Sequence, residues 1–511
     1  MSKVRILKNT GIYTIALILP QIAGFFLLPV YTRWLTPADY AIISLVGSFT
    51  AIAGIFIALQ LQSGIARYVL QFMAKDQKQE AKEILSSVLM VMVMVMLACF
   101  VLLEYFGDYL VKFTYPKSGL TYHPYFQLSL LTIMITALYQ APQAMFKALQ
   151  MAKHFFTVSA MVLFSTIAFN IYFVVFKKMG IYGIFWGSVL GAAIGCVFSF
   201  WLIRNWLCKR FVWEYIPLAM AFSLPLIPHA LGTYLFTGAN RIILEKFVSL
   251  SDIGLFSIAD RLASVPLLLV GAFNVAYNPY FIQAAEIDEK SAVETNSSII
   301  GYWWVAVLTM VLAFVLFSDA ILQIMSTKAY YASAGVASIL VFSSLFRGLY
   351  MFAVSPLFFK KATILIPIIT IVAGCVGIGL NIWAIPRWGI MGAAWATVAA
   401  YFMTFVMAEV VGRRVLQLKY PWKKMLIVSA IWLLIIVLVK ISSPFVIGIN
   451  YYLSWLLSGM GLLIFTILAA HVQNRGLTKL VFDKILRIPL NQLGIFAKEE
   501  AIAEDMGNRP N

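Results

Sequence analysis

The fold is indicated by a stretch that occurs twice, as GIYGIFWGSV at residues 180–189 and as GIMGAAWATV at residues 389–398. The copies share two glycines, a tryptophan and a valine, and they lie 209 residues apart. A second match, at an offset of 208, relates Pro20, Gly24 and Arg33 to Pro228, Gly232 and Arg241. Two matches at nearly one offset indicate that a long segment has been duplicated. Many membrane carriers are built from such repeats, with the substrate site between the copies.

Composition places the chain in a membrane. Of its 511 residues, 62% are hydrophobic and 12% are charged, whereas soluble domains carry about 25% charged residues. The N-terminal apolar run is longer than the core of a signal peptide and has no small-residue cleavage site, so we expect an uncleaved first helix. The sequence therefore predicts an all-α polytopic membrane protein.

Hydrophobic runs of about 20 residues, enough to cross a bilayer, predict about fourteen transmembrane helices. They are expected at residues 11–32, 40–62, 84–106, 123–149, 155–176, 181–203, 217–241, 253–283, 299–318, 329–359, 363–385, 389–411, 425–441 and 451–471. Each copy of the duplication holds six of them, an even number, so both copies enter the membrane from the same side. This predicts two parallel six-helix repeats around a central cavity.

The repeats set the expected domain boundaries. We expect an N-lobe at 1–210, a C-lobe at 217–415, two extra helices at 425–471 and a cytoplasmic tail at 472–511. With both termini in the cytoplasm, most of the 38 lysines and arginines fall on cytoplasmic segments, as the positive-inside rule requires. The net charge of +17 is then explained by anionic lipid rather than nucleic acid, for which we find no binding motif.

Catalytic and metal-binding patterns are missing from the sequence. The four cysteines, Cys99, Cys196, Cys208 and Cys375, have no CxxC spacing and no place in an external loop, so we expect free thiols and no metal. No zinc-protease, nucleophile-elbow or phosphate-loop motif occurs. We expect neither an enzyme nor a cofactor.

Charged residues inside the spans are the candidate site, because a charge in the bilayer usually faces a partner or a wet cavity. The candidates for substrate binding are Arg33, Arg67, Arg241, Arg261 and Arg347, and those for ion coupling are Asp260 and Glu245. Arg33 and Arg67 could instead be interfacial anchors, and Asp260 or Arg347 could form structural ion pairs. Adjacent helical residues point about 100° apart, so if Arg261 faces the cavity, Asp260 faces a neighbouring helix.

The chain resembles the Wzx-type polysaccharide flippases, of the superfamily that also holds the MATE exporters. The residues that carry the resemblance are YTRWLTPADY at 31–40, NRIILEKFVSLSDIGLFSIADRL at 240–262 and the two glycine motifs at 180–183 and 389–392. Position 41 is Ala where the family usually has Gly. In the lipid II branch, arginines on early helices and on the eighth helix line the cavity, and Arg261 is similar in place to the latter.

The resemblance implies a function. The expected substrate is an undecaprenyl-pyrophosphate-linked oligosaccharide, flipped to the outer leaflet of a bacterial inner membrane for O-antigen or lipopolysaccharide synthesis. A glycan polymerase and a chain-length regulator are candidate partners, beside the membrane lipids. Arginine suits phosphate, since it binds two oxygens at once. A MATE-like exporter of cations remains an alternative but should have a net acidic cavity, and a glycan polymerase or ligase should have a large external loop.

Overall fold

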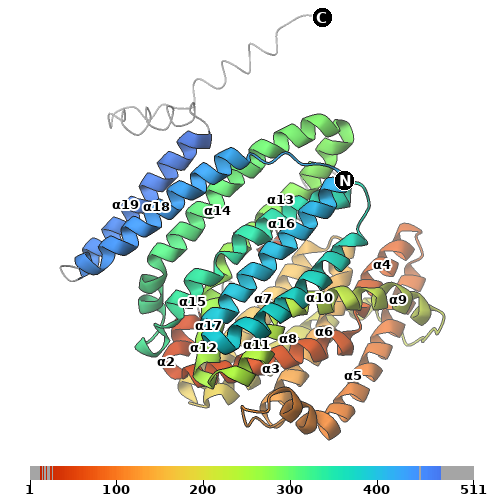
Figure 1. Cartoon of the computed structure of the whole chain (residues 1–511). Helices are drawn as coiled ribbons and strands as arrows, with labels where there is room; N and C mark the ends of the chain where they lie inside the picture. The colour runs from red at the N-terminus through yellow and green to blue at the C-terminus, as the bar shows by residue number, and fades with distance from the viewer. Residues whose placement is uncertain are drawn as a thin grey trace, which may run out of the picture. The chain divides into compact units, whose positions relative to one another are not determined.

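A computed structural model describes residues 12–13, 15–16, 19, 24–25, 27–447 and 451–473. Every regular element in these ranges is helical, as the sequence predicted (Figure 1). The elements are α2 (Leu28–Trp34), α3 (Pro37–Ala58), α4 (Leu61–Ala74), α5 (Lys78–Thr114), α6 (Tyr125–Ala148), α7 (Ala152–Ile171), η1 (Tyr172–Phe176), α8 (Gly180–Ile203), η2 (Arg204–Trp206), α9 (Tyr215–Ser223), η3 (Leu224–Leu226), α10 (Ile227–Thr237), α11 (Ala239–Phe247), α12 (Leu250–Ala263), α13 (Val265–Ile287), α14 (Glu289–Met325), η4 (Lys328–Tyr330), α15 (Ser333–Leu340), α16 (Ser343–Phe359), α17 (Leu365–Val415), α18 (Trp422–Ile447) and α19 (Tyr451–Gln473).

The two repeats are visible in the helix lengths. The third helix of each, α5 and α14, has 37 residues, and the two lie 211 residues apart. The second helix is a 38-residue unit in both, at Pro37–Ala74 and Leu250–Ile287. These units begin alike, because the side chains of Thr36 and Ser249 each accept a hydrogen bond from the backbone N–H three residues on. The fold therefore contains two parallel sets of six helices followed by α18 and α19.

Glycine marks the start of the last helix in each set. Gly180 and Gly389 have φ of 57° and 55°, a left-handed conformation that glycine adopts without steric cost. At Gly389 the 51-residue α17 changes direction, so it comprises the two spans expected at 363–385 and 389–411. In the first repeat a π-helical turn, η1, precedes Gly180. A π turn accommodates inserted residues, and ten positions separate Asn170 from Gly180 where eight separate Asn381 from Gly389.

Membrane crossing is supported by length and composition. Among the described residues, ten helical segments are long and apolar enough to cross a bilayer. Counting α17 as two, and adding α6, α19 and the helical positions among residues 12–34, the structure has a helix at each of the fourteen expected spans. The chain is a multi-pass membrane protein. Pro20, the N-terminal residues 1–11 and the tail beyond residue 473 lie outside the described residues.

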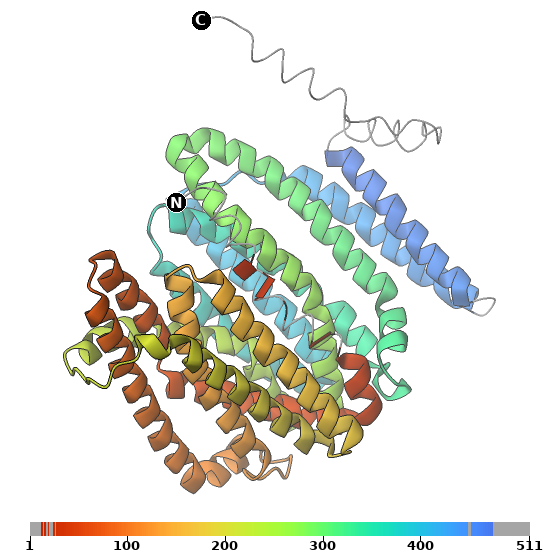
Figure 2. The same ribbon diagram turned by 180° about the vertical axis from the view of Figure 1, so that it is seen from behind.

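The chain divides into two compact units, one formed by residues 1–294 with 317–418 and the other by 295–316 with 419–511. The first unit includes helices of both repeats, so the division does not follow the expected lobe boundaries, which stay a prediction. Within the second unit, α18 lies beside α19 in both views (Figures 1 and 2). There Trp432 Nε1 donates to the Leu308 carbonyl oxygen at 2.9 Å.

The two repeats meet along α3 and α12. Gly254 of α12 packs so closely on the Pro37 carbonyl group of α3 that any Cβ at this position would overlap it. Nearby, the Tyr330 hydroxyl donates to the Leu35 carbonyl oxygen at 2.8 Å. Burial raises the pKa of Tyr330, so its phenol stays a neutral donor. Beyond this seam the second helix is broken, because Leu59 and Gln60 have φ of 45° and 55° between α3 and α4.

Candidate substrate cavity

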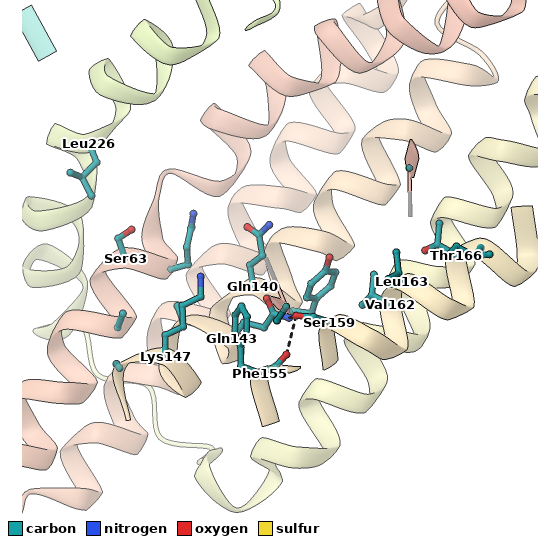
Figure 3. Close-up of a pocket in the computed structure, with 18 of the residues that line it drawn as sticks. Ser63, Gln140, Gln143, Lys147, Phe155, Ser159, Val162, Leu163, Thr166 and Leu226 are labelled. Carbon is teal, nitrogen blue, oxygen red and sulfur yellow. Dashed lines mark hydrogen bonds between the residues drawn. The ribbon is translucent and has the colours of Figure 1, made fainter. Parts of the chain in front are cut away.

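A cavity of about 1150 Å³ lies inside the first unit. The lining side chains come mainly from α4, α6 and α7 of the first repeat, with Phe222, Leu226 and Arg261 added from the second. Figure 3 shows Ser63 of α4, Gln140 and Lys147 of α6 and Ser159 of α7 around the same space. The volume is at the upper end of the range for ligand pockets, about 300–1,000 Å³, so there is room for a large ligand.

The described lining of this cavity is cationic. It includes Arg67, Lys147 and Arg261 and contains no aspartate or glutamate. The uncharged polar side chains are those of amides, hydroxyls and a phenol: Gln62, Ser63, Tyr139, Gln140, Gln143, Ser159, Thr166, Asn170 and Tyr31. Such a lining attracts anions, and its amides and hydroxyls can exchange hydrogen bonds with a hydroxylated ligand.

Arg261 occupies a space that a glycine provides. Its guanidinium packs against Gly24, where an added Cβ would overlap Nη2. The Arg261 charge also interacts with the phenols of Tyr31 and Tyr40, and Tyr31 is held by a 2.7 Å hydrogen bond from Asn170 Nδ2. No hydrogen bond or ion pair joins Arg261 to another residue of the described part of the chain. Its N–H groups are thus available to a ligand.

The other two cations rest on aromatic rings. The Arg67 guanidinium carbon lies 4.4 Å from the ring centre of Phe222, and Lys147 Nζ lies 4.7 Å from that of Phe155. Cation–π contact stabilises a charge without neutralising it. Both side chains therefore add positive potential to the cavity.

A second, smaller cavity of about 410 Å³ shares Arg261 with the first. Arg241 and Asp260 line it and form an ion pair, with 2.6 Å between Nη2 and Oδ2. Arg241 Nε also donates to Ser44 Oγ at 2.7 Å, which ties α11 to α3. The Arg241 side chain is 15% exposed and that of Asp260 43%. Asp260 thus reaches the neighbouring helix while Arg261 faces the large cavity.

The remaining predicted residues lie elsewhere. Arg33 is exposed in the last turn of α2, outside both cavities. Arg347 lies 5.1 Å from the ring centre of Tyr401. Glu245 is 2% exposed, and its Oε1 accepts hydrogen bonds from the backbone N–H groups of Lys117 and Ser118, each at 2.6 Å. The Glu245 carboxylate thus fixes the loop after α5 and lines neither cavity.

Sequence reasoning missed Lys147, Gln140 and Gln143. Lys147 was counted with the cytoplasmic loop after the fourth span, because it stands in the last turn of α6. The glutamines carry no charge and so attracted no attention. A signal was present, since these three residues and Ala144 recur at helical spacing and fall on one face of α6.

The architecture is that of the flippases and multidrug transporters. A lipid II flippase, MurJ, in an inward-closed conformation, matches 91% of this chain and 99% of its own with a TM-score of 0.69 and 16% identity. An inward-facing multidrug transporter of the MATE family matches 80% of this chain and 97% of its own, with a TM-score of 0.62 and 13% identity. The Vibrio cholerae MATE transporter VcmN matches 81% and 96%, with a TM-score of 0.57 and 12% identity.

Sequence comparison gives the family. The family described as "Polysaccharide biosynthesis protein" matches residues 6–285, more than half of the chain, and the protein belongs to it. Among curated proteins, none matches the sequence significantly. Family membership agrees with the flippase resemblance noted in the sequence.

Proposed function

We propose that this protein flips an undecaprenyl-pyrophosphate-linked oligosaccharide from the inner to the outer leaflet of a bacterial inner membrane, by alternating access. The observation that carries the proposal is the large cavity with Arg67, Lys147 and Arg261 and no acidic residue in its described lining. A diphosphate and its sugars lose water on leaving the aqueous phase, and this lining replaces that water with cations, amides and hydroxyls. The lipid tail stays in the bilayer.

The charge of the cavity separates this function from its main rival. An exporter of organic cations needs acidic groups to hold its substrate, whereas this lining is positive. A glycan polymerase or ligase is disfavoured because the longest connection on the outer side, residues 115–124 between α5 and α6, is short. The family description supports a role in polysaccharide biosynthesis, and O-antigen or lipopolysaccharide is the polymer we propose.

The experiment is transport by the full-length protein in proteoliposomes. A fluorescent undecaprenyl-pyrophosphate-linked oligosaccharide should reach the opposite leaflet, and a cationic dye should not. Appearance of a longer glycan would show polymerisation, and movement of the dye alone would show a cation exporter. Either result would overturn the proposal.

Energy coupling belongs to the same proposal. We assign it to protons and to Asp260, because this carboxylate is partly exposed in the second cavity and pairs with Arg241 beside Arg261. Protonation of Asp260 would weaken that pair and change the balance between inward- and outward-open states. Glu245, the other acid predicted for coupling, is bonded to two backbone N–H groups and is the weaker choice.

The proposed setting is the inner membrane with both termini in the cytoplasm. A glycan polymerase and a chain-length regulator would take the product on the far side. Protease-accessible tags at each end of the chain test this orientation in spheroplasts and in inverted vesicles.

A further inference from the structure

One face of the cavity differs between the two repeats, although their backbones correspond. The left-handed residues Gln150 and Lys361 follow α6 and α16, with φ of 57° and 60°, and they lie 211 residues apart. Asn170 and Asn381 have the same offset. The repeats can therefore be compared position by position in this region.

The comparison shows polar residues in the first repeat only. Gln140, Gln143 and Lys147 of α6 correspond to Met351, Val354 and Phe358 of α16. The shared fold does not need the polar residues, since the second repeat forms the same helix without them. Polar groups in a membrane helix are costly to insert, so they indicate a function at this face.

These side chains suit a sugar. Gln143 Nε2 donates to Ser159 Oγ at 3.2 Å, which orients the amide between α6 and α7 (Figure 3). An amide both donates and accepts, and so does a sugar hydroxyl. Lys147, one helical turn beyond Gln143, adds a positive charge that no carboxylate of the described residues neutralises.

Lys147 and Arg261 are too far apart to bind one diphosphate. The Lys147 ammonium lies against Phe155, whereas Arg261 interacts with Tyr31, which Asn170 holds. Phe155 and Asn170 are 15 positions apart on α7, which corresponds to about 22 Å along the helix axis. A diphosphate is much shorter than this, so the cavity has two separate anion sites.

We propose that the cavity selects an acidic glycan: Arg261 binds the diphosphate, and Lys147, with Gln140 and Gln143, binds a sugar that carries a carboxylate. This rests on the proposed function. Arginine at the Arg261 end suits a phosphate, and the amides at the Lys147 end suit a hydroxylated ring. A charge-assisted contact of lysine with a carboxylate corresponds to about ten- to hundredfold in affinity.

The test compares two undecaprenyl-pyrophosphate-linked oligosaccharides that differ only in one sugar, a hexuronic acid or the matching neutral hexose. Wild-type protein in proteoliposomes should move the acidic one at least about tenfold faster at limiting concentration. Lys147→Gln should bring the ratio of the two rates close to one, and Lys147→Arg should keep it. Lys153→Gln is the matched control, because Lys153 is exposed and lies outside the cavity lining.

A second measurement needs no variant. Raising the salt concentration screens an accessible charge pair, so the wild-type ratio should fall with ionic strength. Equal rates for the two glycans, or a ratio that survives Lys147→Gln, would overturn the acidic-glycan proposal while leaving the flippase function intact. Failure of wild type to move either glycan would instead count against the proposed function itself.

Discussion

Replacing Arg261 by alanine should abolish transport while leaving the protein folded. The guanidinium can offer two parallel N–H groups to a phosphate, and each hydrogen bond to a charged group contributes about 1.5–3 kcal/mol. Loss of both lowers the affinity by about two to four orders of magnitude. Because Arg261 makes no hydrogen bond or ion pair within the described chain, the free energy of unfolding should change by only about 0.5 kcal/mol.

The assay is the initial rate at which labelled lipid-linked oligosaccharide reaches the opposite leaflet of proteoliposomes, normalised to protein and measured below saturation. Arg33→Ala is the matched control, since Arg33 is exposed and lies outside both cavities. It should keep the wild-type rate. The reasoning is refuted if Arg261→Ala transports as wild type does, or if both variants lose activity equally.

Three further outcomes are expected. Gly24→Ala should slow transport about tenfold or more by displacing the Arg261 guanidinium, whereas Gly379→Ala, where an added Cβ meets nothing, should not; equal rates would argue against the packing described. Asp260→Asn should remove the response of transport to an imposed pH gradient, and a variant that still responds would exclude Asp260 from coupling. Glu245→Ala should lower the free energy of unfolding by about 3 kcal/mol, because two backbone N–H groups lose a charged acceptor; an unchanged melting temperature in detergent would contradict this.

The sequence predicted the fold because its strongest signals are local. Hydrophobic length locates a membrane helix without any knowledge of its neighbours, and the glycine motifs locate turns that only glycine forms easily. Thus the boundary at Gly389 was expected even though the helices on either side run together as α17. The π turn before Gly180 was not expected, because one added turn geometry leaves no mark in composition.

The site was harder to predict because it depends on long-range contacts. Sequence showed that Asp260 and Arg261 must diverge, but it could not show that Arg241 is the partner of Asp260 or that Gly24 receives Arg261. Arg67 and Arg261 were predicted and do line the large cavity. Lys147 was assigned to a loop, since the depth of a helix end in a folded bundle cannot be read from the chain alone.

The break between α3 and α4 has a mechanical consequence. An unbroken helix transmits bending because each turn is hydrogen-bonded to the next, and the left-handed pair Leu59 and Gln60 interrupts this coupling. On one side of the break, α3 is clamped against α12 by the contact of Gly254 with Pro37. On the other, α4 bears Arg67 and forms a wall of the cavity. The second helix therefore acts as two levers on a common pivot, and a ligand that pulls on Arg67 can tilt α4 without prying open the joint of α3 with α12.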